Sequence, residues 1–200
     1  MKDWRRPQLK KRRFLKAYRQ YGADEVRPRL AEVVKGAEFW VALAVGAGLA
    51  GIGGDSPLHR LQAGQVDSAI ITYAAIAFGF CLAGLTIAIT LPDAAFATEL
   101  ATPENGKPPS RTAFSDLLFV FSWTAVTHWL VIVLSLLALP LLRPDAPLIG
   151  AESSVYHRFI VGLTVAATIY ALLQFLITVI TLSQVGNVYV QHIQRHDPDD

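Results

Sequence analysis

The sequence has 200 residues, of which 52% are hydrophobic and 17% are charged, and its formal net charge is +2. This length fits one domain, while the apolar content and a mean hydropathy of +0.38 are high for a soluble globular protein. The single cysteine, Cys81, excludes a disulfide framework within one chain.

The first 35 residues are strongly basic and hold twelve of the eighteen Lys and Arg residues. Residues 4–21 predict a helix whose basic side chains surround an aromatic face, which is typical of helices at an anionic lipid surface. Its candidate lipid- or partner-binding residues are Lys10, Lys11, Arg12, Arg13, Lys16 and Arg19. They could fix topology, bind anionic lipid or dock an acidic protein face. We do not expect a nucleic-acid partner, because no recognised nucleic-acid-binding module is present.

Four uncharged stretches follow this basic segment, at residues 39–54, 68–92, 117–142 and 159–194. A helix needs about 20 mostly apolar residues to cross the hydrocarbon core of a bilayer. We therefore predict membrane spans over about residues 37–54, 68–91, 115–140 and 159–184. The first stretch is the shortest, and if it were re-entrant the three later spans would be inverted.

The distribution of basic residues predicts the orientation of these spans. Lys and Arg next to membrane spans are retained in the cytoplasm. With both termini cytoplasmic, the two outer loops carry only Arg60, Arg143 and Arg158. We therefore expect a multi-pass protein of the inner (plasma) membrane, with a basic segment at 1–35, a membrane domain at 36–195 and an acidic tail at 196–200.

Helices are also expected to extend beyond the membrane at both ends. Pro28 lies where the first turn of a new helix would be, and the apolar face of that helix continues into the first span as a stalk. The last uncharged stretch is longer than a bilayer needs, so it predicts a second stalk. The loop over 93–113 begins with a short helix through Ala101. The expected fold is an all-α, integral membrane four-helix bundle with cytoplasmic helical extensions.

Two stripes of small or polar residues favour close helix packing in lipid. The stripe on the first span comprises Ala44, Ala47, Gly48, Gly51 and Gly54. The stripe on the second span comprises Thr72, Ile76, Gly79, Ala83, Thr86 and Thr90. Together with the short first span they predict a homo-oligomer, with a tetramer as the working number.

Polar residues on one face of the third span, joined by Ser135, and on one face of the fourth form a candidate intramembrane polar site. Its members are Thr124, Thr127, His128, Gln174 and Thr178. Such groups either hydrogen-bond across a helix bundle or serve sensing or permeation. His128 is the sharpest member, because imidazole titrates near neutral pH.

His192 and His196 have the i, i+4 spacing of two metal ligands on a helix, but the pair lacks a clear third ligand. We expect a solvated chain end there, with no metal and no cofactor.

The sequence also argues against most membrane enzymes and pumps. We expect no Asp, Glu, Lys or Arg within the spans, whereas proton-coupled pumps use a buried carboxylate. Paired cysteines for disulfide oxidation, a second membrane-depth histidine for haem, and two buried aspartates for proteolysis are missing as well. A serine-based site lacks a Gly-framed nucleophile turn. We therefore predict that the chain is not an enzyme.

The unusual residues gather at the cytoplasmic ends, which favours an oligomeric membrane anchor or sensor that holds a cytosolic effector. In size and helix count the chain resembles small bacterial membrane proteins of anti-phage systems, such as the membrane subunit of Kiwa and the four-helix effectors of nucleotide-signalling systems. This resemblance implies a role in anti-phage defence. One alternative is a small pore that depolarises the membrane, lined by the polar faces of the third and fourth spans. A small-solute transporter is the other alternative.

Overall fold

The computed structural model describes residues 27–51, 61–90, 94–102, 112–142, 147–149 and 153–196. Within these ranges the chain is helical and contains no β-strand, which confirms the all-α prediction. The helices are α2 (Arg27–Lys35), α3 (Ala37–Gly51), α4 (Ala63–Ile89), α5 (Ala94–Ala101), α6 (Ala113–Ala138) and α7 (Val155–His196). The predicted helix over residues 4–21 and the acidic tail after His196 lie outside the described residues.

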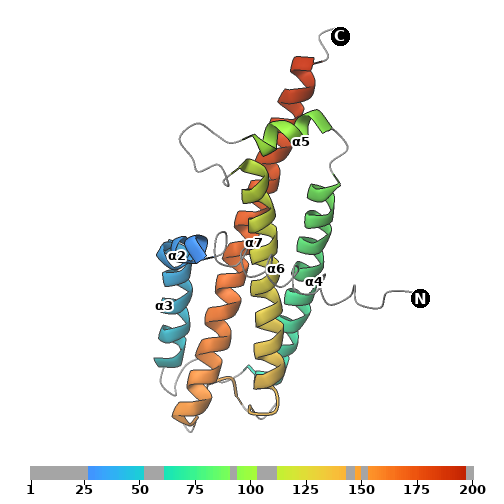
Figure 1. The fold of residues 1–200 in the computed structure, drawn as a ribbon. Coiled ribbons are helices and arrows are strands. Elements are labelled where there is room, and N and C mark those ends of the chain that lie inside the picture. The colour runs from blue at the N-terminus through green and yellow to red at the C-terminus, as the bar shows by residue number, and fades with distance from the viewer. Residues whose placement is uncertain are drawn as a thin grey trace, which may run out of the picture. The chain divides into compact units, whose positions relative to one another are not determined.

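Three helices, α4, α6 and α7, are long and apolar enough to cross a membrane. They run side by side in Figure 1. Helices α2 and α3 together provide a fourth candidate if this bent pair acts as one span. The structure therefore supports a helical membrane protein with three spans of sufficient length.

Local sequence explains where α6 and α7 begin. Thr112 and Ser115 form a reciprocal capping box, in which each hydroxyl accepts a hydrogen bond of 3.1 Å from the other residue's backbone N–H. Ser154 caps α7 in a similar way, because its Oγ accepts from the backbone N–H of His157 at 3.1 Å. Each cap satisfies backbone donors that a helix N-terminus leaves without an intrahelical partner.

Helix α6 packs against both α4 and α7. Buried apolar residues form three clusters along these helices: Ala63, Ala138, Leu142, Leu148, Ile149 and Val161; Ala74, Val131 and Ala171; and Ala88, Leu117 and Phe121. The first cluster is closed by the segment between α6 and α7. There, Leu148 N–H donates to Leu61 O at 2.8 Å, and Gln62 pairs with Pro147 in an isolated bridge.

Glycines allow two close contacts between helices. A Cβ placed on Gly84 of α4 would overlap the ring of Phe121 on α6. A Cβ on Gly46 of α3 would lie 2.5 Å from Gly162 O and 2.6 Å from Ala166 Cβ on α7. Both contacts follow the rule that small residues let helix backbones approach closely in membranes.

Within one chain, the small-residue stripes do not pack against the other described helices, and the homo-oligomer predicted from them stays a prediction. Gly48, Gly51 and Gly79 have no neighbouring atom within reach of an added Cβ. On α4 the buried face instead comprises Ala63, Asp67, Ala74, Ala77, Cys81, Gly84 and Ala88. The Thr-rich stripe of α4 is exposed, and its hydroxyls donate to carbonyls of their own helix. Counting small residues alone did not reveal which face meets a neighbour.

The expected continuous stalk below the first span is also corrected. The chain breaks at Gly36, and α2 and α3 meet there at a bend of 52°. The backbone N–H of Gly36 still donates to Glu32 O and Val33 O, so α2 ends regularly at this residue. A Cβ at Gly36 would lie 3.2 Å from Val33 O and would meet the Glu38 carboxylate, a flexible group that can move aside.

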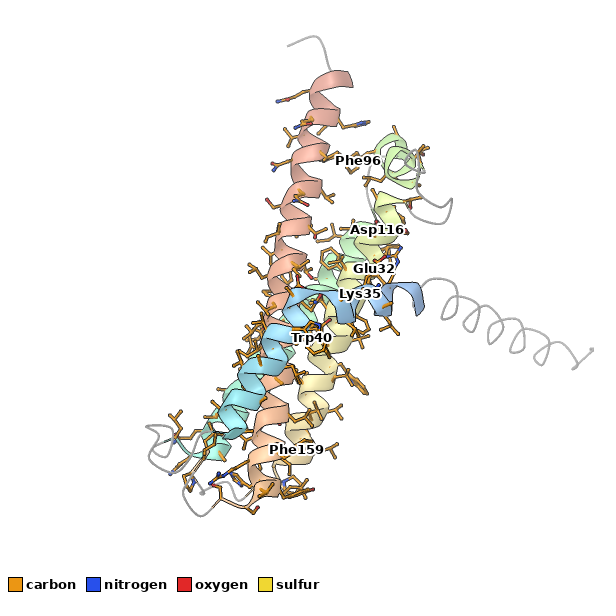
Figure 2. The ribbon with its side chains drawn as sticks, turned by 90° about the vertical axis from the view of Figure 1, so that its left-hand side faces the viewer. Glu32, Lys35, Trp40, Phe96, Asp116 and Phe159 are labelled. Carbon is orange, nitrogen blue, oxygen red and sulfur yellow. The ribbon has the colours of Figure 1, made fainter. Side chains whose placement is uncertain are left out.

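Helix α7 continues without a break for 42 residues, which corresponds to about 63 Å. Helix α5 packs beside its C-terminal part, where the Phe96 ring lies 4.9 Å from the ring of Tyr189 and 5.4 Å from that of His192. Figure 2 shows Phe159 near one end of α7 and Phe96 beside the other end. The short helix expected through Ala101 is therefore present. It packs on the C-terminal part of α7 around Tyr189 and His192, which we call the extended end of α7.

Candidate functional site

The structure brings together the polar residues that the sequence placed on two separate helices. Thr124 of α6 and Thr178 of α7 are fully buried, and their hydroxyl oxygens lie 2.7 Å apart. The backbone carbonyl of Gln174 accepts from Thr178 Oγ1 at 2.9 Å and from Thr124 Oγ1 at 3.4 Å. Gln174 thus joins the site through its main chain, although we had selected it for its side chain.

His128 is the centre of this site and has no exposed surface. Its Nδ1 lies 2.7 Å from Thr124 O, and its Nε2 lies 3.1 Å from the hydroxyl of Tyr73 on α4. A backbone carbonyl can only accept, so Nδ1 carries the proton and donates to Thr124 O. In the neutral imidazole, Nε2 then accepts from Tyr73 O–H. Both ring nitrogens are satisfied without a ligand or a charge.

Thr127 is buried but does not join the contact between the helices. Its hydroxyl donates to Thr124 O on the same helix at 2.8 Å. We refer to Tyr73, Thr124, His128 and Thr178, with the Gln174 carbonyl, as the His128 cluster. This cluster links α4, α6 and α7 by hydrogen bonds near the middle of α6.

Aromatic side chains surround the His128 cluster, and we did not select them from the sequence. The ring of Phe175 packs edge-on against His128 at 5.9 Å and against Phe80 at 5.3 Å. Trp123 Nε1–H donates to the Tyr170 hydroxyl at 2.9 Å, which adds a second polar bond between α6 and α7. Tyr73 was also missed, although a tyrosine in the middle of an uncharged span is a recognisable signal for a hydrogen-bond partner.

A second polar group lies at the opposite end of α6 from the capping box. Because α4 begins at Ala63 rather than at the predicted residue 68, Asp67 lies inside the helix and is only 6% exposed. The fully buried Ser135 hydroxyl of α6 faces its carboxyl group. The structure therefore adds a buried acidic residue to the helix that contains the predicted second span. The sequence-based boundary had placed Asp67 just outside the span.

Two other groups of candidate residues remain, the basic N-terminal residues and the histidine pair near the end of α7. The basic residues Lys10, Lys11, Arg12, Arg13, Lys16 and Arg19 lie outside the described part of the chain. His192 is buried against Phe96. Among the residues that the structure describes, no group of three His, Cys, Asp or Glu side chains is arranged to hold a metal ion.

A groove of about 340 Å³ lies where α5, α6 and the extended part of α7 meet. Its walls include Leu100, Asp116, Leu117, Gln184, Val185 and Val188. The lining is mainly apolar, with polar groups at Asp116 and Gln184. The α7 residues that line this groove lie between Thr181 and Val188, well after the α7 residues that lie near Asp67, Val161 to Val165.

Comparison of the chain with protein families, with curated proteins and with solved structures finds no match. The geometry of the chain itself is therefore the basis for assigning a function.

Proposed function

We propose that the chain is a non-enzymatic membrane anchor or sensor that holds a cytosolic protein on the extended end of α7. The observation that carries this proposal is the length of α7. A hydrocarbon core about 30 Å thick takes about 20 residues of helix, whereas α7 has 42. About half of the helix therefore extends beyond the core.

The extended end of α7 presents apolar surface where lipid would not cover it. Val188, Val190 and Ile193 are each between 44% and 53% exposed. Polar residues, Asn187, Gln191 and Gln194, are interspersed with them and are also exposed. An exposed apolar patch with polar surroundings marks an interaction surface, and the groove beside α5 adds a concave part to it.

Within this proposal, α2 and α3 together form the first of four spans, both termini are cytoplasmic, and the membrane is the inner (plasma) membrane. The exposed stripe on α4 leaves a surface for the proposed homo-oligomer, with a tetramer as the working number. Anti-phage defence remains the proposed setting.

A pore fits the geometry of a single chain less well. Three of the side chains proposed as its lining, Thr124, His128 and Thr178, are buried and form hydrogen bonds within the His128 cluster. A water-filled lumen would require these groups to face solvent. Small-solute transport has one observation in its favour, the buried Asp67, because carboxylates at membrane depth serve coupled transport.

Co-purification from native cells tests the anchor proposal. The full chain carries an N-terminal tag, and a triple variant replaces Val188, Val190 and Ile193 by Ser. A matched control replaces Asn187, Gln191 and Gln194 by Ser on the same turns. Because each buried aliphatic side chain contributes about 1.5–3 kcal/mol, the apolar variant should lose its cytosolic partner by at least about tenfold. The control should retain it.

Two outcomes would contradict the proposal. The wild-type chain could purify without a stoichiometric cytosolic protein, or both variants could retain the partner equally. Equal membrane content and equal thermal stability of the two variants establish that folding has not changed.

A further inference from the structure

Asp67 and Ser135 form a buried polar pair that the His128 cluster does not use. Asp67 lies in the second turn of α4, and Ser135 lies near the C-terminal end of α6. The Ser135 hydroxyl faces the Asp67 carboxyl group, but among the described residues neither Asp67 Oδ2 nor Ser135 Oγ has a hydrogen bond of good geometry. Buried polar atoms normally have partners, so an unsatisfied pair of this kind requires an explanation.

Two small cavities adjoin the Asp67 carboxyl group. One, of about 20 Å³, is also lined by Thr164 and by apolar side chains that include Ile70, Val161 and Val165. The other, of about 10 Å³, is lined by Asp67 with Gly64, Leu139 and their neighbours. A cavity of about 10–15 Å³ holds one water molecule. The larger cavity therefore has room for a single water next to two side chains that carry oxygen, Asp67 and Thr164.

An ionised carboxylate at this position would be costly, because burial without a compensating charge disfavours the anion strongly. Among the residues that the structure describes, no basic side chain lines either cavity. The dipole of α4 gives little help, since its effect is confined to the first turn and Asp67 lies in the second. Hard metal ions take six or more oxygen ligands. The described part of the chain supplies three polar side chains here, Asp67 and Thr164 in the cavity lining and Ser135 facing the carboxyl group, which is too few for such an ion.

We propose that Asp67 is a proton-binding site. Its carboxylate takes one proton from solution, no other bond breaks, and the site changes from −1 to neutral. The neutral acid donates a hydrogen bond to one water in the larger cavity, which Thr164 also lines, and the Ser135 hydroxyl faces the same carboxyl group. This inference does not depend on whether α7 holds a cytosolic partner.

The proposal has a mechanical consequence for the bundle. Asp67 is surrounded by the first apolar cluster, which includes Ala63, Leu142 and Leu148. Loss of the proton would place a charge in this cluster and weaken the packing of α4 on α6 and α7 at this end. Proton concentration would then act as the stimulus of the bundle.

The effect of other charged or titratable groups at this end must be separated from that of Asp67. On α7 these are His157, whose Nε2–H donates to Leu148 O at 3.0 Å, and Arg158. Among the described residues of α4 and α6 that line the two cavities, Asp67 is the only one with a titratable side chain. Several other charged or titratable residues are close in sequence to these segments but lie outside the described residues: His59, Arg60, Arg143, Asp145 and Glu152.

Infrared spectroscopy of the full chain, labelled with ¹³C at the aspartate carboxyl groups and held in lipid nanodiscs, tests the proposal directly. At neutral pH the wild type should show the carbonyl band of a protonated aspartic acid. Asp67→Asn should abolish this band. Asp116→Asn, the matched control in the first turn of α6, and His157→Gln should leave it unchanged. A wild type without the band, or a band that survives Asp67→Asn, would overturn the proposal.

Two further infrared measurements test the proposal, one on a Ser135 variant and one in buffers with and without sodium. Ser135→Ala retains the carboxyl group but removes the hydroxyl that faces it, so it should shift the position of the band. An unchanged band would exclude the proposed arrangement. Spectra in sodium-free and sodium-containing buffer should be the same. A band that disappears when sodium is added would identify a Na⁺ site and refute proton binding.

Discussion

His128 shows how a buried polar residue can be satisfied by its own bundle. Its two ring nitrogens contact the Thr124 carbonyl and the Tyr73 hydroxyl, and no exposed surface remains. A neutral imidazole fits this environment, with one nitrogen donating and the other accepting. The hydrogen bonds therefore favour the packing role of His128 over the sensing role that its sequence position also suggested. If the chain senses protons, Asp67 is the better candidate.

The Tyr73–His128 hydrogen bond leads to a prediction at the residue scale. Tyr73→Phe removes the hydroxyl and leaves the Nε2 lone pair of His128 buried without a donor. We expect the free energy of unfolding in mixed micelles to fall by about 0.5–1.5 kcal/mol. The ¹⁵N chemical shift of His128 Nε2 should change at the same time. Tyr156→Phe, at a tyrosine that is 63% exposed, serves as the control and should change neither quantity. Equal stability of the wild type and Tyr73→Phe would show that this bond does not hold α4 to α6.

At the scale of elements, the contact between α3 and α7 depends on glycine. The ideal Cβ position of Gly46 lies 2.5 Å from the backbone oxygen of Gly162, and that of Gly162 lies 2.8 Å from Ala50 Cβ. A helix backbone cannot move away as a flexible side chain can. Any residue larger than glycine must therefore separate the two helices.

Gly46→Ala should destabilise this contact by about 1–3 kcal/mol, the usual cost of overpacking. Backbone amides of α3 should then exchange hydrogen faster, as measured by mass spectrometry in detergent. Gly48→Ala is the matched control two residues away, where nothing lies within 4 Å of the added atom. It should be neutral or slightly stabilising, because alanine favours a helix by up to about 1 kcal/mol over glycine. If both variants behave alike, α3 does not pack on α7 through Gly46.

The same elements show what the sequence could and could not predict. Uncharged runs predicted α4, α6 and α7, since a length of about 20 apolar residues is a strong signal. The residues of the His128 cluster on α6 and α7 were also accessible, because polar groups stand out in an apolar helix. The partner Tyr73 and the packed face of α4 were not, because they depend on how the helices are rotated about their axes. The burial of Asp67 inside α4 was not predicted, because a charged residue was taken to mark the end of a span.

At the scale of the whole molecule, the number of membrane crossings depends on α2 and α3. The structure offers three spans, or four if this bent pair counts as one. An odd number of crossings would place the two termini on opposite sides of the membrane, and an even number would place them on the same side. The orientation of the extended end of α7 relative to the basic N-terminal segment follows from this count.

We predict four crossings, with both termini in the cytoplasm. Cysteines introduced as Lys2→Cys, Ser56→Cys and Ser110→Cys, and one appended after Asp200, can be labelled with a membrane-impermeant maleimide on intact and on permeabilised cells. The native Cys81 is fully buried, so it should contribute little background. Position 56 should react in intact cells, because it follows the first span. Positions 2 and 110 and the C-terminal cysteine should react only after permeabilisation. A reactive position 2 in intact cells, with the C-terminus still protected, would instead show that α2 and α3 do not cross the membrane. In that case the basic N-terminal segment and the extended end of α7 could not bind the same cytosolic partner.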